Sequence, residues 1–139
     1  MTGLLGYASY VPRFRLGRRV VAGYDEDSTT MAVAAATAAL HETESTAVYF
    51  ATSSPAYADK TNAAAIHAAL GLPASVFAAD LCGTGRSAFA AMMLAAQTGG
   101  IAVAADVRVG RPGSADEKRG GDGAAALVFG EGPVIAEVL

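Results

Sequence analysis

The stretch that decides the fold is Phe77-Ala78-Ala79-Asp80-Leu81-Cys82-Gly83-Thr84-Gly85-Arg86-Ser87-Ala88, where an apolar segment runs into a glycine turn and then into an apolar helical pattern. A sharp turn from strand to helix exposes several backbone N–H groups at a helix N-terminus, where a cysteine thiolate would be stabilised. The stretch holds the single cysteine, Cys82. Three interpretations are open: a nucleophile turn for acyl transfer, a dinucleotide-binding turn, and a tight connection with a buried cysteine.

Length and composition predict one folded domain over residues 1–139, because 53% of the residues are hydrophobic and 17% are charged. The net charge of −3 argues against a nucleic-acid-binding protein, and no apolar run is long and bulky enough to predict a membrane span. One cysteine cannot form an internal disulfide, and the first residues show no signal-peptide pattern. We therefore expect a soluble, cytoplasmic protein.

Strand and helix patterns alternate along the chain. We expect strands over residues 3–11, 47–52, 76–81, 101–106, 124–129 and 133–139, helices over 29–40, 62–70 and 86–97, and loops over 12–27 and 108–122. This order predicts an α/β fold with helices on both faces of a mostly parallel sheet. Only three residues separate the last two strands, which are expected to form a hairpin, so the sheet is mixed, with five or six strands.

Two charged segments have ordinary structural interpretations. Asp25, Glu26 and Asp27 are consecutive acids that could suggest a metal, but acids before a helix pattern are more simply explained as N-terminal capping, so no metal is assigned. The arginines of the first loop are expected to be solvated.

The helix expected over residues 86–97 is apolar on all sides. Such a helix is normally buried all round. The sheet of its own domain can cover only one face, and the 33 alanines and 16 glycines of the chain favour broad, close contacts. The pattern therefore predicts a partner surface over the other face.

Several short motifs, in this order, resemble hydroxymethylglutaryl-CoA synthases of the archaeal and actinobacterial type in the thiolase superfamily. The resemblance covers nearly the whole chain, with ketoacyl-ACP synthase III as a more distant relative. The motifs are Gly6-Tyr7-x-x-Tyr10-Val11-Pro12-Arg13, Asp27-Ser28-x-Thr30-Met31-Ala32, Tyr57-Ala58-x-Lys60, Ala78-Ala79-Asp80-Leu81 and Gly120-Gly121-Asp122-Gly123-Ala124-Ala125-Ala126.

The resemblance implies a fold and partners. Members of the family consist of two similar α/β halves packed around two buried central helices, and this sequence corresponds to the amino-terminal half, with residues 86–97 as one of the central helices. A second thiolase-like half, from another chain or a second copy, is the implied partner. Some relatives also use an OB-fold or zinc-ribbon protein.

The catalytic residues of the family are not all matched. The family nucleophile lies five residues after the aspartate equivalent to Asp80, a position held here by Gly85, so Cys82 is three residues early. The general acid/base glutamate maps onto Ser53. The family histidine belongs to the other half, and His41 and His67 are expected to be structural.

The resemblance implies an acyl-CoA substrate and no separate cofactor. At the turn, Thr84, Arg86 and Ser87 are candidate substrate-binding residues, with capping as the alternative. Arg108 and Arg111 lie in the polar loop, where they could meet the phosphates of CoA. The reaction implied is acyltransfer with formation or cleavage of a carbon–carbon bond.

Two other functions are open. A non-catalytic subunit that only supports a catalytic partner would explain the absent nucleophile and acid. A dinucleotide-binding domain would explain Gly83-x-Gly85-x-x-Ala88 after a strand, with Asp106 ending the next strand.

Overall fold

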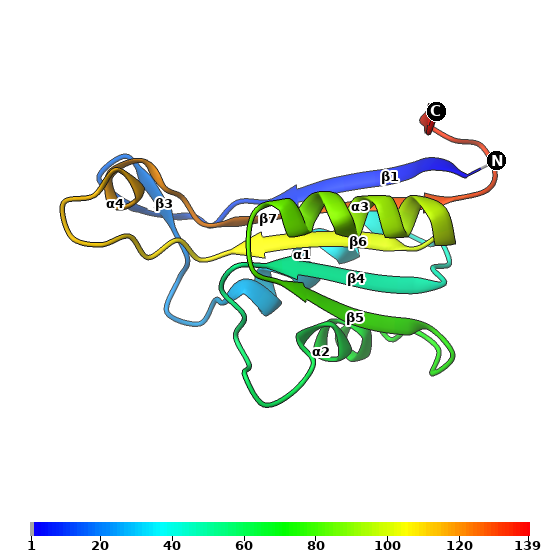
Figure 1. Cartoon of the computed structure of the whole chain (residues 1–139), viewed down its shortest axis with the longest axis horizontal. Coiled ribbons are helices and arrows are strands. Elements are labelled where there is room, and N and C mark those ends of the chain that lie inside the picture. The colour runs from blue at the N-terminus through cyan, green and yellow to red at the C-terminus, as the bar shows by residue number, and fades with distance from the viewer. Residues whose placement is uncertain (1) are drawn as a thin grey trace.

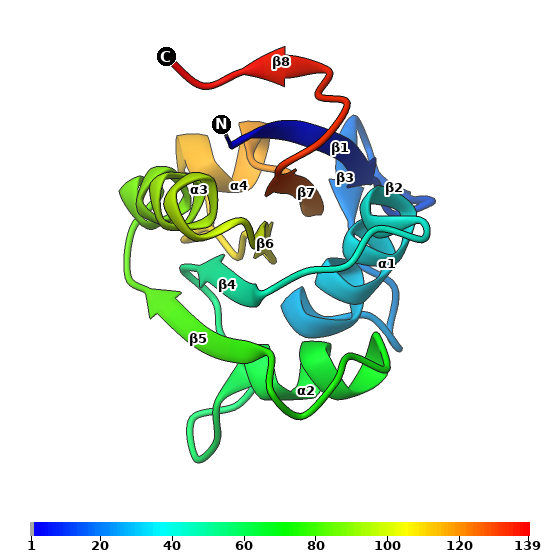
Figure 2. The ribbon, with the colours of Figure 1, turned by 90° about the vertical axis from the view of Figure 1, so that its right-hand side faces the viewer.

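The computed structural model describes residues 2–139 and contains one mixed six-stranded sheet with helices on both faces (Figures 1 and 2). The sheet order is β5-β4-β6-β7-β1-β8. Its strands are β1 (Gly3–Tyr10), β4 (Ala47–Thr52), β5 (Phe77–Cys82), β6 (Ile101–Asp106), β7 (Gly123–Gly130) and β8 (Ala136–Glu137). The helices are α1 (Ser28–Leu40), α2 (Asn62–Ala69), α3 (Arg86–Thr98) and α4 (Ala115–Arg119), and β2 (Phe14–Leu16) pairs with β3 (Arg19–Val21).

Strand β4 is the centre of the parallel part of the sheet, because it pairs in parallel with both β5 and β6. All six of its residues are buried. Its side chains alternate between two cores, as the period of a strand requires. Val48 and Phe50 pack with α1 and α2, whereas Tyr49 and Ala51 pack with α3.

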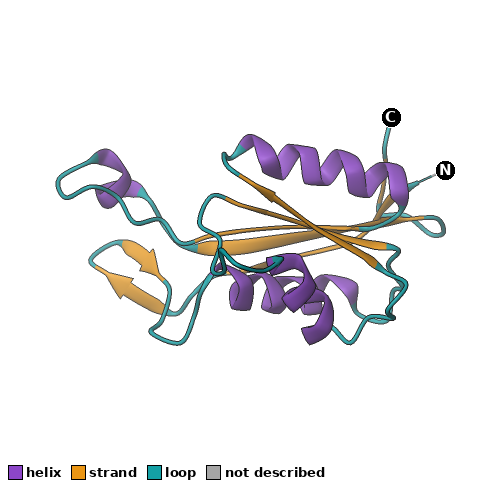
Figure 3. Ribbon diagram, turned by 60° about the horizontal axis from the view of Figure 1, so that its bottom comes forward, coloured by secondary structure: helices purple, strands orange, loops and turns teal. Residues whose placement is uncertain are grey.

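Helices α1 and α2 cover one face of the sheet and α3 covers the other (Figure 3). The alanines of α1 that face the sheet are completely or almost completely buried. Their small side chains let the helix backbone lie close to β1, β6 and β7. The predicted α/β class, with helices on both faces, is confirmed.

The acids before α1 form the predicted cap. The N-cap residue is Asp27, whose side chain accepts from the Thr30 backbone N–H at 2.8 Å, and the Thr30 hydroxyl accepts from the Asp27 backbone N–H. Glu26 accepts from the Tyr10 hydroxyl and, at 2.6 Å, from the Gly23 backbone N–H. These acids therefore join the helix start to β1 and to the preceding loop.

The prediction of a hairpin between the last two strands is wrong. Strand β7 is flanked by β6 on one side and β1 on the other, so neither edge of β7 is free. The chain turns past β7 and β8 adds to the outer edge of β1, with Gly3 opposite Glu137. Strand β8 is also much shorter than the predicted strand.

Two segments expected to be loops contain secondary structure and project together beyond the sheet (Figures 1 and 3). We call these two segments together the arm. It consists of residues 11–24, which contain β2 and β3, and residues 107–121, which contain α4. Asp122 ties the two segments to the sheet: its side chain accepts from the Ala22 and Arg108 backbone N–H groups, each at 2.7 Å.

One face of α3 is uncovered in this domain. Ala91, Ala95 and Ala96 are buried against the sheet. On the other side Phe89 is 65% exposed and Met93 is 42% exposed. The prediction that its own sheet covers only one face of this apolar helix is confirmed.

Candidate functional site

The candidate residues lie at the carboxyl edge of the sheet, which we define as the edge where β4, β5 and β6 end. Because the three strands are parallel, the residues that follow them meet at this edge. Ser53 follows β4, Cys82 ends β5 and Asp106 ends β6. The structure thus brings together residues that are far apart in the sequence.

The connection from β5 to α3 is the sharp turn expected from the sequence. Gly83 has a φ of 139°, which favours glycine, and its N–H donates to the Thr52 carbonyl at 3.1 Å. The Ser87 N–H donates to the Thr84 carbonyl at 2.9 Å. The N-cap residue Gly85 has no side chain to cap the helix. The Thr84 hydroxyl accepts from the Arg86 N–H at 3.3 Å, so the capping alternative holds for Thr84, and Thr84 and Arg86 are both exposed.

Cys82 is exposed, but it lies on the strand and not in the turn. It is opposite Thr52 in the parallel register. Partial burial, together with the nearby Asp80 carboxylate, raises the pKa of its thiol above the ordinary value. The thiolate is therefore disfavoured at neutral pH.

Asp80 is a structural anchor that sequence reasoning did not assign. Helix α2 has no side-chain cap from its own N-cap residue, Thr61. Instead Asp80, on the neighbouring β5, accepts from the Ala63 N–H at 2.6 Å and from the Asn62 N–H at 2.8 Å. The buried Asn62 side chain also donates to Asp80 and bonds the Tyr57 backbone through both its nitrogen and its oxygen. An aspartate in the middle of an otherwise apolar strand was the available signal.

Ser53, the residue onto which the family resemblance maps the general acid, is held by Asp106. The Asp106 Oδ1 atom accepts from the Ser53 N–H at 2.6 Å and from the Ser53 hydroxyl at 2.9 Å. The Thr52 hydroxyl, at 3.1 Å, and the Ser54 hydroxyl, at 3.4 Å, donate to the same oxygen. This carboxylate therefore fixes the end of β4 against the end of β6.

This arrangement does not fit the dinucleotide alternative. In a dinucleotide-binding unit the strand before the glycine turn and the strand that carries the acid are neighbours. Here β4 lies between β5 and β6. Asp106 is also engaged with the residues that follow β4, so the Gly83, Gly85 and Asp106 pattern does not form that site.

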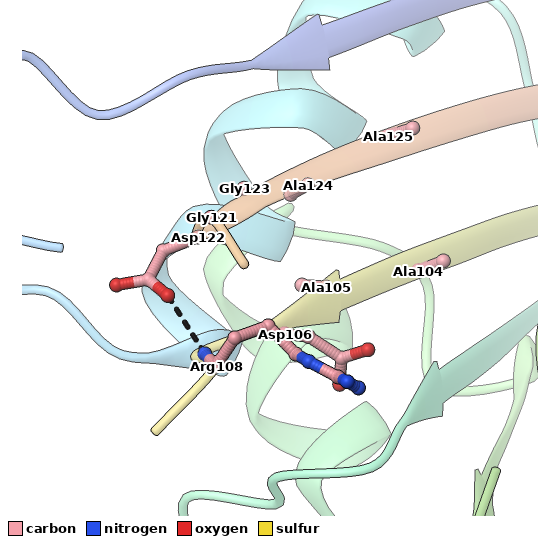
Figure 4. A pocket seen from close by; sticks show the side chains of 9 residues that line it. All are labelled: Ala104, Ala105, Asp106, Arg108, Gly121, Asp122, Gly123, Ala124 and Ala125. Atoms are coloured by element: carbon pink, nitrogen blue, oxygen red, sulfur yellow. Dashed lines mark hydrogen bonds between the residues drawn. The ribbon is translucent and has the colours of Figure 1, made fainter. Parts of the chain in front are cut away.

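A pocket of about 430 Å³ opens where β6 ends and β7 begins (Figure 4). Asp106, Arg108 and Asp122 are its charged residues, and glycines and alanines form the rest of its wall. A neighbouring pocket of about 300 Å³ contains Ser53 and Arg108. Small side chains leave room here for a ligand beside one arginine and two carboxylates.

The remaining candidates lie apart. Arg108 pairs with Asp116 at 3.4 Å, and Arg111 is exposed on the arm. Within residues 2–139 no hydrogen bond or ion pair joins either arginine to the turn that carries Thr84, Arg86 and Ser87. The structure therefore contains two groups of candidate binding residues, one at the turn and one at the base of the arm.

The two histidines lie on α2 and directly after α1. His67 lies on α2 and its Nε2 is 3.0 Å from the Pro73 carbonyl oxygen. His41 ends α1 with a φ of 46°. In the described part of the chain, no cluster of His, Cys, Asp and Glu is suited to a metal ion, and no helix is long and apolar enough to cross a membrane.

No family model matches the chain. Among curated proteins, hydroxymethylglutaryl-CoA synthase of Archaeoglobus fulgidus is 34% identical over 172 aligned positions, which cover 99% of this chain and 50% of that protein. The synthase of Picrophilus torridus is 31% identical, with 99% and 49% covered. The chain thus spans about half the length of the curated relatives it matches. The alignments are longer than its 139 residues, so the matched part of the relatives contains segments that this chain lacks.

Solved structures of similar fold also match this chain over about half of their own length or less. The 3-oxoacyl-(acyl carrier protein) synthase III FabH of Pseudomonas aeruginosa superposes with a TM-score of 0.82 at 24% identity, covering 94% of this chain and 50% of that chain. MvaS, solved in complex with 3-hydroxy-3-methylglutaryl coenzyme A, gives a TM-score of 0.83 at 18% identity, covering 95% and 40%. At these identities the likeness establishes the fold alone. The chain therefore has the fold of one half of a thiolase-superfamily enzyme, and along nearly its whole length its sequence resembles hydroxymethylglutaryl-CoA synthase.

Proposed function

We propose that this domain is one half of a thiolase-fold enzyme that handles acyl-CoA or acyl-carrier-protein thioesters and makes or breaks a carbon–carbon bond. A second thiolase-like half, from another chain or a second copy, packs on α3. The uncovered apolar face of α3, in a domain that matches half the length of its relatives, carries this proposal. Covering such a face removes apolar surface from water, which is the main favourable term in association.

The turn at the start of α3 supplies binding groups for the thioester. Its Thr84 and Ser87 hydroxyls can donate to an oxygen that becomes negative during acyl transfer. Arg86 can hold the same oxygen or a phosphate. At the arm, Arg108 and Arg111 are the candidates for the phosphates of CoA. The chemistry proposed needs no separate cofactor, because CoA enters as part of the substrate.

Cys82 is not the covalent nucleophile in this proposal. Its raised pKa leaves little thiolate at neutral pH, and it lies on the strand before the turn. Ser53 cannot replace a carboxylic acid as a proton donor of suitable acidity, and its hydroxyl is bonded to Asp106. We therefore expect the nucleophile and the general acid to come from outside this domain.

Because Cys82 and Ser53 do not supply a nucleophile and a general acid, a second function is a candidate. If the domain is a non-catalytic subunit of such a complex, Cys82 and Ser53 have no chemical role and the domain serves only to complete the fold of its partner. This alternative predicts normal assembly without any effect of substitutions at the turn on catalysis.

The test is carried out on the assembled protein. Native mass spectrometry should find the domain bound to a second thiolase-like half, and incubation with acetyl-CoA should leave Cys82 without an acetyl group. Cys82→Ala should retain activity within about tenfold, whereas loss of a covalent nucleophile removes several orders of magnitude. A stoichiometric thioester on Cys82 would overturn the assignment. Reduced acyl-CoA binding in Arg86→Gln, with assembly intact, would separate the catalytic from the purely structural function.

A further inference from the structure

The arm concentrates the positive charge of the molecule. Eight of the ten lysines and arginines lie in residues 11–24 and 107–121, together with only two acids. The arm thus carries a net charge of +6, whereas the rest of the chain carries −9 against a total of −3. Seven of the eight basic residues are exposed. The small overall charge hides this separation.

The two segments of the arm are held together, so their charges form one surface. An Arg19 guanidinium N–H donates to the Arg108 carbonyl at 2.7 Å, and the Asp122 N–H donates to the Val20 carbonyl at 3.1 Å. Together with the two bonds accepted by the Asp122 side chain, these contacts fix β3 beside the segment that leads to α4. The separation of charge is therefore a property of the folded domain.

Apolar side chains are exposed among these arginines. Phe14 is 58% exposed and Leu16 69% exposed on β2, and Val109 is 88% exposed on the other segment. A two-stranded ribbon of three-residue strands has no second layer that could bury them. Arginine together with aromatic and aliphatic side chains is a composition enriched at protein–protein interfaces.

We propose that the arm is a docking surface for a protein partner whose own surface combines acidic and apolar side chains. Such a surface would pair with the arginines and cover Phe14 and Leu16 at the same time. A small anion would neutralise charge but leave the apolar side chains in water. A nucleic acid or an anionic membrane, being an extended polyanion, would also approach the rest of the domain, whose charge of −9 would repel it.

The arm lies beside the candidate site. Arg108, at the base of the arm, borders both pockets at the carboxyl edge of the sheet. A partner seated on the arm would therefore lie beside the candidate site and not on the α3 face. The inference does not depend on the proposed function, because docking can be measured without any acyl transfer.

Fluorescence anisotropy with labelled peptides tests the proposal. One short peptide combines glutamate and leucine, and a second has the same charge with serine in place of leucine. The protein should bind the Glu–Leu peptide more tightly than the Glu–Ser peptide, and raising the salt concentration from about 0.05 M to about 0.5 M should weaken both. Single-stranded RNA and phosphatidylserine vesicles serve as competing probes.

Variants of the arm sharpen the test. The side chains of Arg18 and Arg119 are exposed and make no hydrogen bond or ion pair with the described residues, so Arg18→Glu and Arg119→Glu should leave the melting temperature unchanged. Each should weaken binding of the Glu–Leu peptide at least about fivefold. Lys60→Glu, the same charge change outside the arm, should have little effect. Leu16→Ser should weaken binding of the Glu–Leu peptide only.

Several results would overturn the inference. They are the absence of binding by either peptide, equal binding of both, tighter binding of RNA or vesicles than of the Glu–Leu peptide, and an equal effect of Lys60→Glu and the two arm variants.

Discussion

Removing the Asp80 carboxylate should destabilise the domain markedly, because this side chain caps a helix from a neighbouring strand. In Asp80→Ala, the Ala63 and Asn62 backbone N–H groups and one N–H of the Asn62 side chain all lose their acceptor. Loss of a helix cap costs about 0.5–2 kcal/mol, and each buried polar group left unpaired costs about 1–3 kcal/mol. Asp80 is partly buried, so water can replace some of these bonds. We therefore expect a loss of about 2–4 kcal/mol.

Urea unfolding followed by circular dichroism measures this loss. The matched control is Asp59→Ala, at an exposed position of the loop before α2, where the expected loss is below about 0.5 kcal/mol. Asp80→Asn keeps one acceptor oxygen and should fall between the two. If Asp80→Ala and Asp59→Ala cost the same, Asp80 does not hold α2 and the structural role assigned to it is wrong.

Three further predictions concern Cys82, the Tyr10–Glu26 pair and α3. Because burial and Asp80 raise the pKa of the Cys82 thiol, its alkylation by iodoacetamide should reach half its maximal rate above about pH 8.5, and a midpoint below about pH 7 would contradict the account. The hydrogen bond from Tyr10 lowers the pKa of Glu26, and the same bond raises the pKa of Tyr10. The bond therefore stabilises the fold at neutral pH. Its contribution is lost as pH falls through the folded-state pKa of Glu26 and as pH rises through that of Tyr10. The unfolding free energies of wild type and Tyr10→Phe should accordingly differ near pH 7, and the difference should shrink as pH falls below about 4 and as pH rises above about 10, whereas a difference that is constant with pH would count against the bond. In α3, Ala91 is 1% exposed and Met92 is 37% exposed, so Ala91→Lys should unfold the domain, whereas Met92→Lys should leave the domain folded and disrupt its assembly with a second half. Equal effects of the two lysines on melting temperature would refute the distinction between the two faces.

The central architecture could be predicted from local patterns. The apolar run before Cys82, the glycine turn and the apolar helix after it correspond to β5 and α3 within a residue or two. The partial exposure of α3 also followed from its sequence, because one sheet cannot cover an apolar helix on every side. These features could be predicted because they depend on the spacing of apolar residues along the chain, which can be read from a single sequence.

The predictions that were wrong or missing concern contacts between segments that are far apart in the sequence. The three residues between the last two predicted strands favour a hairpin locally, but β1 already occupies that edge of β7. The β2–β3 hairpin and helix α4 had local signals, the turn at Gly17 and the Ser114 cap that accepts from the Glu117 N–H, but their position side by side depends on Asp122, which joins residues about a hundred positions apart. The same limit applies to the site: an aspartate in or at the end of an apolar strand is visible in the sequence, but the partners of Asp106 and Asp80 depend on strand order.

Oxidative footprinting of the methionines tests the central claim, that a second thiolase-like half covers α3, most directly. In the isolated domain, Met92 and Met93 should be oxidised rapidly, while Met31, with no exposed surface, remains protected. In the native assembly, the account predicts that Met92 and Met93 become as protected as Met31. Rapid oxidation of Met92 and Met93 in a folded native assembly would contradict it.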